Sequence, residues 1–360
     1  MLNDILEFFK KEKFYTVLFL LAVVGMSYAV LRKESEKEKS ENAATVERFH
    51  QMEKKLETKV KDAGSLEAYF KQHPVTTQVF GFFSLAIIGV FGLGLVLDFG
   101  LMWKPAWRAR LVRPRPPDAV GWKISMLVKV LLLFLTSGIV LGFLLGLAKR
   151  IFAWPLSDNF YLLFHTTLMD FLCFVFILRI LKKGNGGWQD LGLNIPGGKI
   201  FREVLLGWAG YAALLPLFLG TLAALVAFAN WVHYEPPPHP LVGIFLEEER
   251  SPFLVAYSIV LGTVLGPVLE EIFFRGFCYP ILKKRFGMFL AMVLTSIFFA
   301  SIHGNSFAFL PIFILGMGLA LLYEIRGSLV APIALHITHN MIFIGYFFLA
   351  KTFLVHASGG

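Results

Sequence analysis

Two adjacent glutamates, Glu270 and Glu271, lie inside an apolar stretch of the sequence, GPVLEEIFFRGF. An acidic side chain at the centre of a membrane helix costs about 2.5–3.5 kcal/mol, so it persists only with a partner or a function. Glu271 and Arg275 are four residues apart, in the orientation that favours an ion pair on one helix face. We expect Glu270, which has no such cation, to be the more desolvated glutamate and the general base. The alternative is that both glutamates only hold helices together.

Three further polar residues interrupt the later apolar stretches. His303 ends one of them, and His336 and Asn340 lie four residues apart on one face of the last. A lone histidine in such a place is usually a packing residue. Together with the glutamates, however, these side chains supply a base, a partner to orient it and hydrogen-bond donors for a developing oxyanion.

The motifs follow one another as Glu-Glu-x-x-x-Arg, then Phe-x-x-x-His from Phe299, then His-x-x-x-Asn from His336. This order resembles the CAAX-protease and bacteriocin-processing family of intramembrane proteases, which includes the prenyl-protein endopeptidases. The flanking Gly266-Pro267 and Phe274-Arg275-Gly276 resemble the same signature. The resemblance covers about residues 185–350 and implies hydrolysis of peptide bonds inside the membrane.

The resemblance also implies a role for each motif residue. Glu270 would activate water with help from His303, and His336 and Asn340 would stabilise the tetrahedral oxyanion. The second glutamate and the arginine would be the supporting pair. We expect no cofactor, because an asparagine on the face of His336 suits an oxyanion hole better than a metal shell. The alternative is a Zn²⁺ site of Glu270, His303 and His336, since three protein ligands plus water are a normal catalytic set.

The composition indicates which elements position these residues. The chain is 56% hydrophobic and 16% charged, whereas soluble domains are about 25% charged. Its apolar runs are long and continuous rather than alternating, which predicts an all-α, polytopic membrane helical bundle and not a barrel. The net charge of +9 comes from short loops between apolar runs, as membrane orientation produces, so nucleic acid is not an expected partner. The expected partners are the lipid bilayer and a membrane-embedded or membrane-associated peptide or protein substrate.

The hydropathy pattern predicts nine spans, with an extracytoplasmic helical segment between the first two: 15–31, 77–102, 124–147, 160–181, 203–230, 253–282, 287–303, 307–323 and 329–349. Lysine and arginine crowd the second, fourth and sixth loops, which are therefore expected to be cytoplasmic. The third loop, with Lys149 and Arg150, fits least well. The chain is thus expected to be a multi-pass integral membrane protein, of the cytoplasmic membrane if bacterial. A retained first span is favoured over a cleaved signal peptide.

We divide the chain into four parts. Residues 1–76 hold the first span and a charged extracytoplasmic segment, 77–184 the accessory transmembrane helices, 185–350 the protease-like core, and 351–360 the C-terminal tail. Within the first part, residues 32–72 have the periodicity of a helical hairpin, and a solvated linker is the alternative. This segment is the expected site for a partner protein.

The remaining intramembrane polar residues are interpreted as packing or boundary residues: Asp98, His165, Asp170, Glu324 and His339. His339 is also an alternative to His336 as the donor. Straight, perpendicular helices would place Glu270, His303 and His336 at different depths. One site therefore requires that the last three spans be tilted, short or partly re-entrant.

The sequence favours an intramembrane endopeptidase over two other functions. One is a non-catalytic membrane adaptor or bacteriocin-immunity-type binding protein on the same fold. The other is a transporter with a proton-coupling glutamate, for which inverted repeats with broken helices would be expected. A complete set of three motifs disfavours both.

Overall fold

The computed structural model describes residues 2–31, 70–105, 122–152, 156–183, 188–193, 200–234, 244–245 and 251–356, with isolated positions at 47, 51, 54, 58, 67 and 236. In these ranges the regular structure is helical and no strand occurs. The expected all-α fold is therefore confirmed. Most of the segment 32–72 lies outside the described residues, as do the loops that carry the arginines of 108–115 and the glutamates of 247–249.

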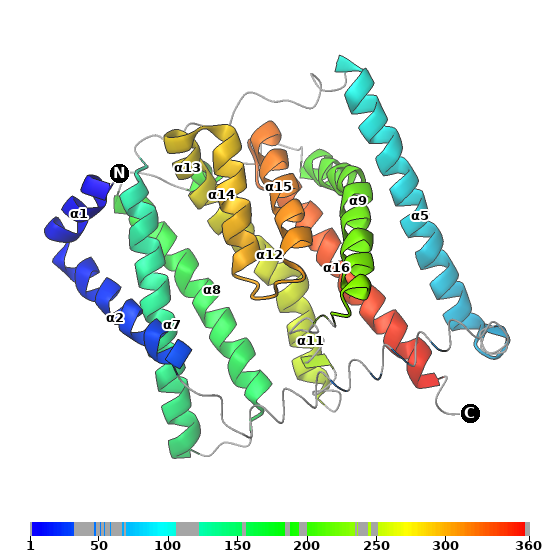
Figure 1. Cartoon of the computed structure of the whole chain (residues 1–360), viewed down its shortest axis with the longest axis horizontal. Helices are drawn as coiled ribbons and strands as arrows, with labels where there is room; N and C mark the ends of the chain where they lie inside the picture. The colour runs from blue at the N-terminus through cyan, green and yellow to red at the C-terminus, as the bar shows by residue number, and fades with distance from the viewer. Residues whose placement is uncertain are drawn as a thin grey trace.

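The helices follow one another along the chain as separate rods packed side by side (Figure 1). Their bounds are α1 (Leu2–Lys11), α2 (Lys13–Leu31), α5 (Pro74–Trp103), α7 (Ile124–Phe152), α8 (Asp158–Lys183), the 3-10 turn η1 (Trp188–Leu191), α9 (Ile200–Trp231), α14 (Met288–Ser301), α15 (Phe309–Arg326) and α16 (Val330–His356). Between α9 and α14 a single long rod runs from residue 252 to residue 286.

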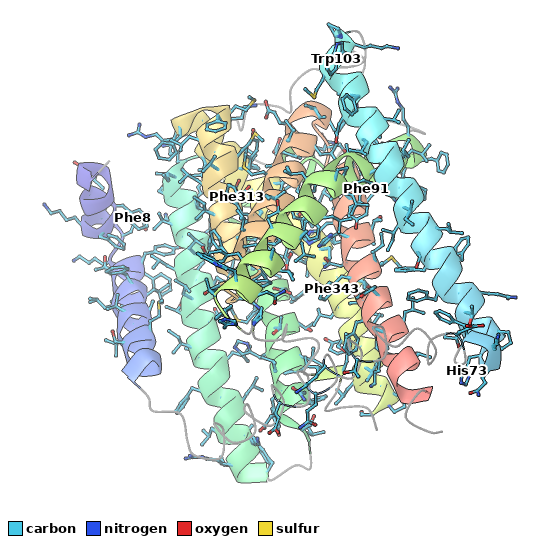
Figure 2. The ribbon with its side chains drawn as sticks, turned by 45° about the vertical axis from the view of Figure 1, so that its right-hand side comes forward. Phe8, His73, Phe91, Trp103, Phe313 and Phe343 are labelled. Atoms are coloured by element: carbon cyan, nitrogen blue, oxygen red, sulfur yellow. The ribbon has the colours of Figure 1, made fainter. Side chains whose placement is uncertain are left out.

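Seven helices of the described residues are long and apolar enough to cross a membrane. Figure 2 marks the ends of one of them, α5, by His73 and Trp103. The nine expected spans are therefore approximate. The first corresponds to α2, of which Lys13–Ser27 is a shorter apolar helix, and the seventh to α14, which has only 14 residues.

The basic residues mark one end of the bundle, which we call the basic end. Lys182 and Lys183 lie in the last turn of α8, and Lys284 and Arg285 in the last turn of the 252–286 rod. Both of these helix ends lie at the top of Figure 1, whereas α16 runs to the bottom. At the opposite end Lys149 forms an ion pair with Asp158. This pair offsets part of the positive charge that made the third loop fit the expected membrane orientation least well.

The helices α14 and α15 form a short hairpin. At 1.5 Å per residue α14 is about 21 Å long, which is less than the roughly 30 Å hydrocarbon core of a bilayer. The hairpin enters from the basic end and turns back at residues 302–308, well short of the lower end of the 252–286 rod (Figure 1). One of the last three spans is thus short, as a single site requires, and the half-buried His303 lies in the turn at its end.

The rod that carries the glutamates alternates between α- and π-helical geometry. It consists of α11 (Pro252–Val260), η2 (Leu261–Leu265), α12 (Gly266–Glu271), η3 (Ile272–Cys278) and α13 (Tyr279–Phe286). Each π segment ends two residues before a proline, Pro267 or Pro280, whose ring would clash with the carbonyl four residues earlier. The wider turns relieve this clash: the Gly266 N–H donates to Leu261 O, five residues back. Such π segments are frequent at functional sites.

Candidate active site

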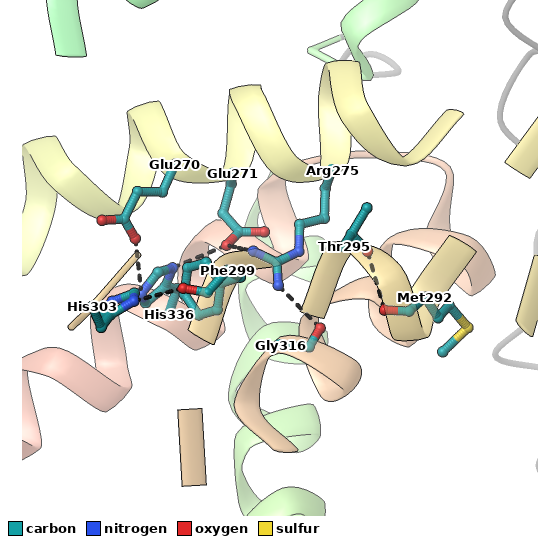
Figure 3. A network of polar contacts seen from close by, with 9 residues as sticks. All are labelled: Glu270, Glu271, Arg275, Met292, Thr295, Phe299, His303, Gly316 and His336. Atoms are coloured by element: carbon teal, nitrogen blue, oxygen red, sulfur yellow. Dashed lines mark hydrogen bonds and ion pairs between the residues drawn. The ribbon is translucent and has the colours of Figure 1, made fainter. Parts of the chain in front are cut away.

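Glu271 is the centre of a buried polar network (Figure 3). Its Oε1 accepts hydrogen bonds from Arg275 Nη1 at 2.7 Å and from His336 Nδ1 at 3.0 Å. The Glu271 and Arg275 side chains are both 0% exposed, and that of His336 is 3% exposed. The ion pair expected from the spacing of four residues is therefore confirmed. The network also ties α16 to the 252–286 rod, which the sequence spacing alone did not indicate.

Arg275 is held from three sides. Besides Glu271, its Nη2 donates to Gly316 O of α15 at 3.0 Å, and its guanidinium carbon lies 4.7 Å from the ring centroid of Phe299 on α14. The planar, forked guanidinium suits this combination of carboxylate, carbonyl and aromatic ring, which a lysine ammonium could not satisfy. Arg275 thereby fixes the α14–α15 hairpin against the glutamates.

Glu270 differs from its neighbour in exposure. Its side chain is 28% exposed, and its Oε2 lies 3.7 Å from His336 Nε2. The expectation that Glu270 is the more desolvated glutamate was wrong, because the Glu271 side chain is completely buried between helices and the Glu270 side chain is partly exposed. A partly exposed carboxylate beside a histidine is nevertheless placed to meet water.

The two histidines contact one aromatic ring. His303 Nδ1 donates to Phe299 O at 2.7 Å, and the His303 and His336 rings lie 4.9 Å and 5.6 Å from the Phe299 ring, centroid to centroid. Each histidine thus forms its hydrogen bond through Nδ1, His303 to Phe299 O and His336 to Glu271. The Nε2 atom of each ring is therefore left to face other groups. In the described part of the chain, His303 makes no hydrogen bond to either glutamate.

Asn340 lies one turn beyond His336 on α16. Its amide Nδ2 donates to Gly262 O at 2.7 Å, a carbonyl of the π segment η2. The second N–H of the same amide stays available to another acceptor. Asn340 thus joins the cluster through the backbone below Glu270 rather than through a glutamate.

The other intramembrane polar residues have separate surroundings. His339 packs edge-on against Tyr211 and Phe218 of α9, so it faces a different helix from His336. Glu324 accepts hydrogen bonds from Lys283 Nζ and Tyr279 at 2.8 Å, as a boundary residue would. His165 bonds Gly138 O at 3.2 Å, which agrees with a packing role.

Sequence reasoning missed two features of this region. Asp170 of α8, interpreted as a packing residue, lies close enough to Glu270 for the two carboxyl groups to interact electrostatically. A second buried pair, Glu203 with Arg326, ties α9 to the end of α15 through two hydrogen bonds of 2.9 and 2.7 Å. Glu203 lies near the start of a predicted span, and this was the one signal that could have identified it.

Residues 252–342 match the model of a family described as Type II CAAX prenyl endopeptidase Rce1-like. A "Putative membrane peptidase YdiL" of Bacillus subtilis (strain 168) is 24% identical over 180 residues, which cover 47% of this chain and 65% of that protein. The chain thus spans slightly less than two thirds of that relative's length. No solved structure matches.

The matched residues 252–342 are an Rce1-like segment, and the family resemblance carried by the three motifs is confirmed. This segment contains every predicted site residue from Glu270 to Asn340. Both comparisons support a membrane protease. Together with the seven long apolar helices, they support an integral, multi-pass membrane protein.

Proposed function

We propose that the protein is an intramembrane endopeptidase that hydrolyses a peptide bond of a membrane-associated peptide or protein. The observation that carries the proposal is the pairing of two unlike glutamates. Glu270 is partly exposed beside His336, and Glu271 is fully buried between His336 and Arg275. One carboxylate is thus free to exchange protons, and the other is held in place as a fixed charge.

In the proposed reaction Glu270 takes a proton from a water molecule, with His303 Nε2 as a second group that orients the water. The water oxygen attacks the carbonyl carbon of the substrate, and the carbonyl oxygen becomes an oxyanion. Glu270 then returns the proton to the amide nitrogen as the carbon–nitrogen bond breaks. Protons and bonds balance without an additional reactant.

His336 and Asn340 are the proposed donors to the oxyanion. Because Glu271 accepts from His336 Nδ1, the imidazole is fixed with Nε2 toward Glu270, and Nε2 donates when it carries a proton. Asn340 contributes the N–H that is not used on Gly262 O. Donors fixed before the reaction stabilise the developing charge at little reorganisation cost. Arg275 and Glu271 are positioning residues in this scheme.

We propose the mechanism without a metal. In the described residues no group of three or more histidine, cysteine, aspartate or glutamate side chains is arranged to hold a metal ion. His336 Nδ1 is engaged by Glu271 and His303 Nδ1 by a carbonyl, so the Nε2 atom of each ring is the one that faces the site. In the proposed mechanism His303 Nε2 orients the water and His336 Nε2 donates to the oxyanion.

The proposal is tested by identifying the new N-termini of membrane proteins in cells that express the wild type and comparing them with those in cells that express Glu270→Gln. We expect a small set of termini that depends on Glu270 and that reappears when the purified wild type, reconstituted in liposomes, is given a peptide spanning the cleaved bond. Asp98→Asn, which removes an intramembrane acid of α5 outside the site, is the matched control and should cleave as the wild type does. If Glu270→Gln cleaves as well as the wild type does, the mechanism is refuted. If no new N-terminus depends on Glu270, a non-catalytic binding protein is favoured instead.

A further inference from the structure

Asp170 is a third carboxyl group near the two glutamates, and the proposed mechanism does not use it. It lies on α8, which precedes the matched residues 252–342 along the chain. Asp170 is half-buried in a helix long and apolar enough to span the membrane, and it forms no hydrogen bond or ion pair with any residue that the structure describes. An acid in such a place persists only with a partner or a function.

One face of α8 packs along the rod that carries the glutamates. Its members recur at three- and four-residue steps and so share one side of the helix: Leu163, Thr167, Asp170, Phe174, Ile177 and Leu181. Leu163 shares a buried cluster with Leu261, which precedes the glutamates on the rod. Ile177 shares another with Ile272, which follows them. Asp170 lies between Leu163 and Ile177 on this face, and therefore at the level of the glutamates.

Glu270 lies between α8 and α16. Its helix, α12, contacts both of these helices, and Figure 1 shows α12 between them. On the α16 side, His336 Nε2 lies 3.7 Å from Glu270 Oε2. On the α8 side, the carboxyl group of Asp170 lies close enough to Glu270 to interact with it electrostatically. The partly exposed Glu270 thus has the proposed oxyanion donors on one side and a second carboxyl group on the other.

A peptide bond presents its two polar groups in opposite directions. In the planar trans unit, the C=O points to one side and the N–H to the other. The proposed oxyanion donors, His336 and Asn340, both belong to α16, so the scissile C=O would point toward α16. The N–H of the same bond then points away from α16, toward α8. Asp170 is the carboxyl group on that side, and an ionised carboxylate only accepts hydrogen bonds.

We propose that Asp170 is a further catalytic residue, which accepts a hydrogen bond from the N–H of the peptide bond to be cleaved. The inference rests on the proposed peptidase function. The contact holds the scissile nitrogen in place while Glu270 returns the proton to it, and no bond to Asp170 forms or breaks. The substrate class is accordingly a polypeptide cleaved at a secondary amide. A bond that precedes proline has no N–H to donate and is disfavoured.

Replacing the N–H by an oxygen atom tests this contact. The probe is the peptide that spans the bond identified from the Glu270-dependent N-termini, made once with the amide and once with an ester at that bond. Asp170→Ala should lower kcat/KM for the amide about 10–100-fold, as expected for a hydrogen bond to a charged group. It should leave the value for the ester nearly unchanged, because the ester has no N–H to lose. Asp98→Asn, outside the site, should change neither.

The ratio of the amide effect to the ester effect separates a catalytic from a structural role. If Asp170→Ala does not fold, Asp170→Asn, which is close to aspartate in volume, should likewise lower cleavage of the amide alone. An equal loss for amide and ester, or a loss for neither, would overturn the inference and leave the peptidase function standing.

The wild type alone provides a second readout. The new N-termini that depend on Glu270 should not begin with proline, and a set in which proline is as frequent as elsewhere in the same proteins would overturn the inference. If Glu270→Gln cleaves the amide as well as the wild type does, or if no terminus depends on Glu270, the peptidase function itself fails and the role of Asp170 fails with it.

Discussion

The substitution Arg275→Met is the most direct test of the buried network, because Arg275 contacts Glu271, Gly316 and Phe299 at once. It removes the charge that pairs with Glu271 at 2.7 Å, the donor to Gly316 O at 3.0 Å and the cation over Phe299, while it keeps much of the side-chain volume. Breaking a fully buried ion pair from one side costs about 3–5 kcal/mol, because the remaining charge stays desolvated. We therefore expect the free energy of unfolding to fall by about 3–5 kcal/mol.

The assay is unfolding in mixed micelles by titration with a denaturing detergent. The reporter is a thiol-reactive fluorogenic dye, which reacts as Cys278, 1% exposed in the folded chain, becomes accessible. Arg202→Met, which replaces an exposed arginine of α9, is the matched control and should change the free energy by less than about 0.5 kcal/mol. A double-mutant cycle then isolates the pair.

The double variant Glu271→Gln, Arg275→Met contains neither charge. Its cost should be about 1–3 kcal/mol less than the sum of the two single costs, because it leaves no unpaired ion in the interior. Strict additivity of the single costs would refute the reasoning. A cost below about 1 kcal/mol for Arg275→Met alone would also refute it, since the guanidinium would then not be needed by Glu271.

Three further predictions concern the site and its supports. Glu270→Gln should lower kcat by about 10²–10⁴-fold in the reconstituted peptide assay with little change in the free energy of unfolding, since this side chain is partly exposed; a loss of stability instead of activity would contradict the assigned role. Asn340→Ala should lower kcat by about 10²–10³-fold with KM nearly constant, and the result would contradict an oxyanion role if KM alone rose. Gly94→Ala should destabilise the chain by about 1–3 kcal/mol, because its Cβ would lie 2.0 Å from Ala212 O of α9; Gly89→Ala on the same helix, with nothing within 4 Å, should be neutral, and equal effects would contradict the close packing of α5 on α9.

Local patterns in the sequence were sufficient for the helices and for part of the site. Long apolar runs predicted membrane helices because lipid leaves the backbone no partner but itself. The spacing of four residues predicted the pair of Glu271 with Arg275, since residues i and i+4 share a helix face. The order of the three motifs likewise carried the family resemblance, without any knowledge of how the helices pack.

Contacts between distant segments were decided by the tertiary structure alone. No local pattern indicates that His336 bonds Glu271, that Arg275 reaches Gly316 O, or that Glu203 meets Arg326, because each contact depends on how helices cross. The exposure of the two glutamates was inverted for the same reason: it is set by the neighbours that cover each side chain. The sequence thus determined which residues bear the chemistry. Only the packing of a short hairpin against a proline-widened helix decided which carboxylate is partly exposed and which is buried.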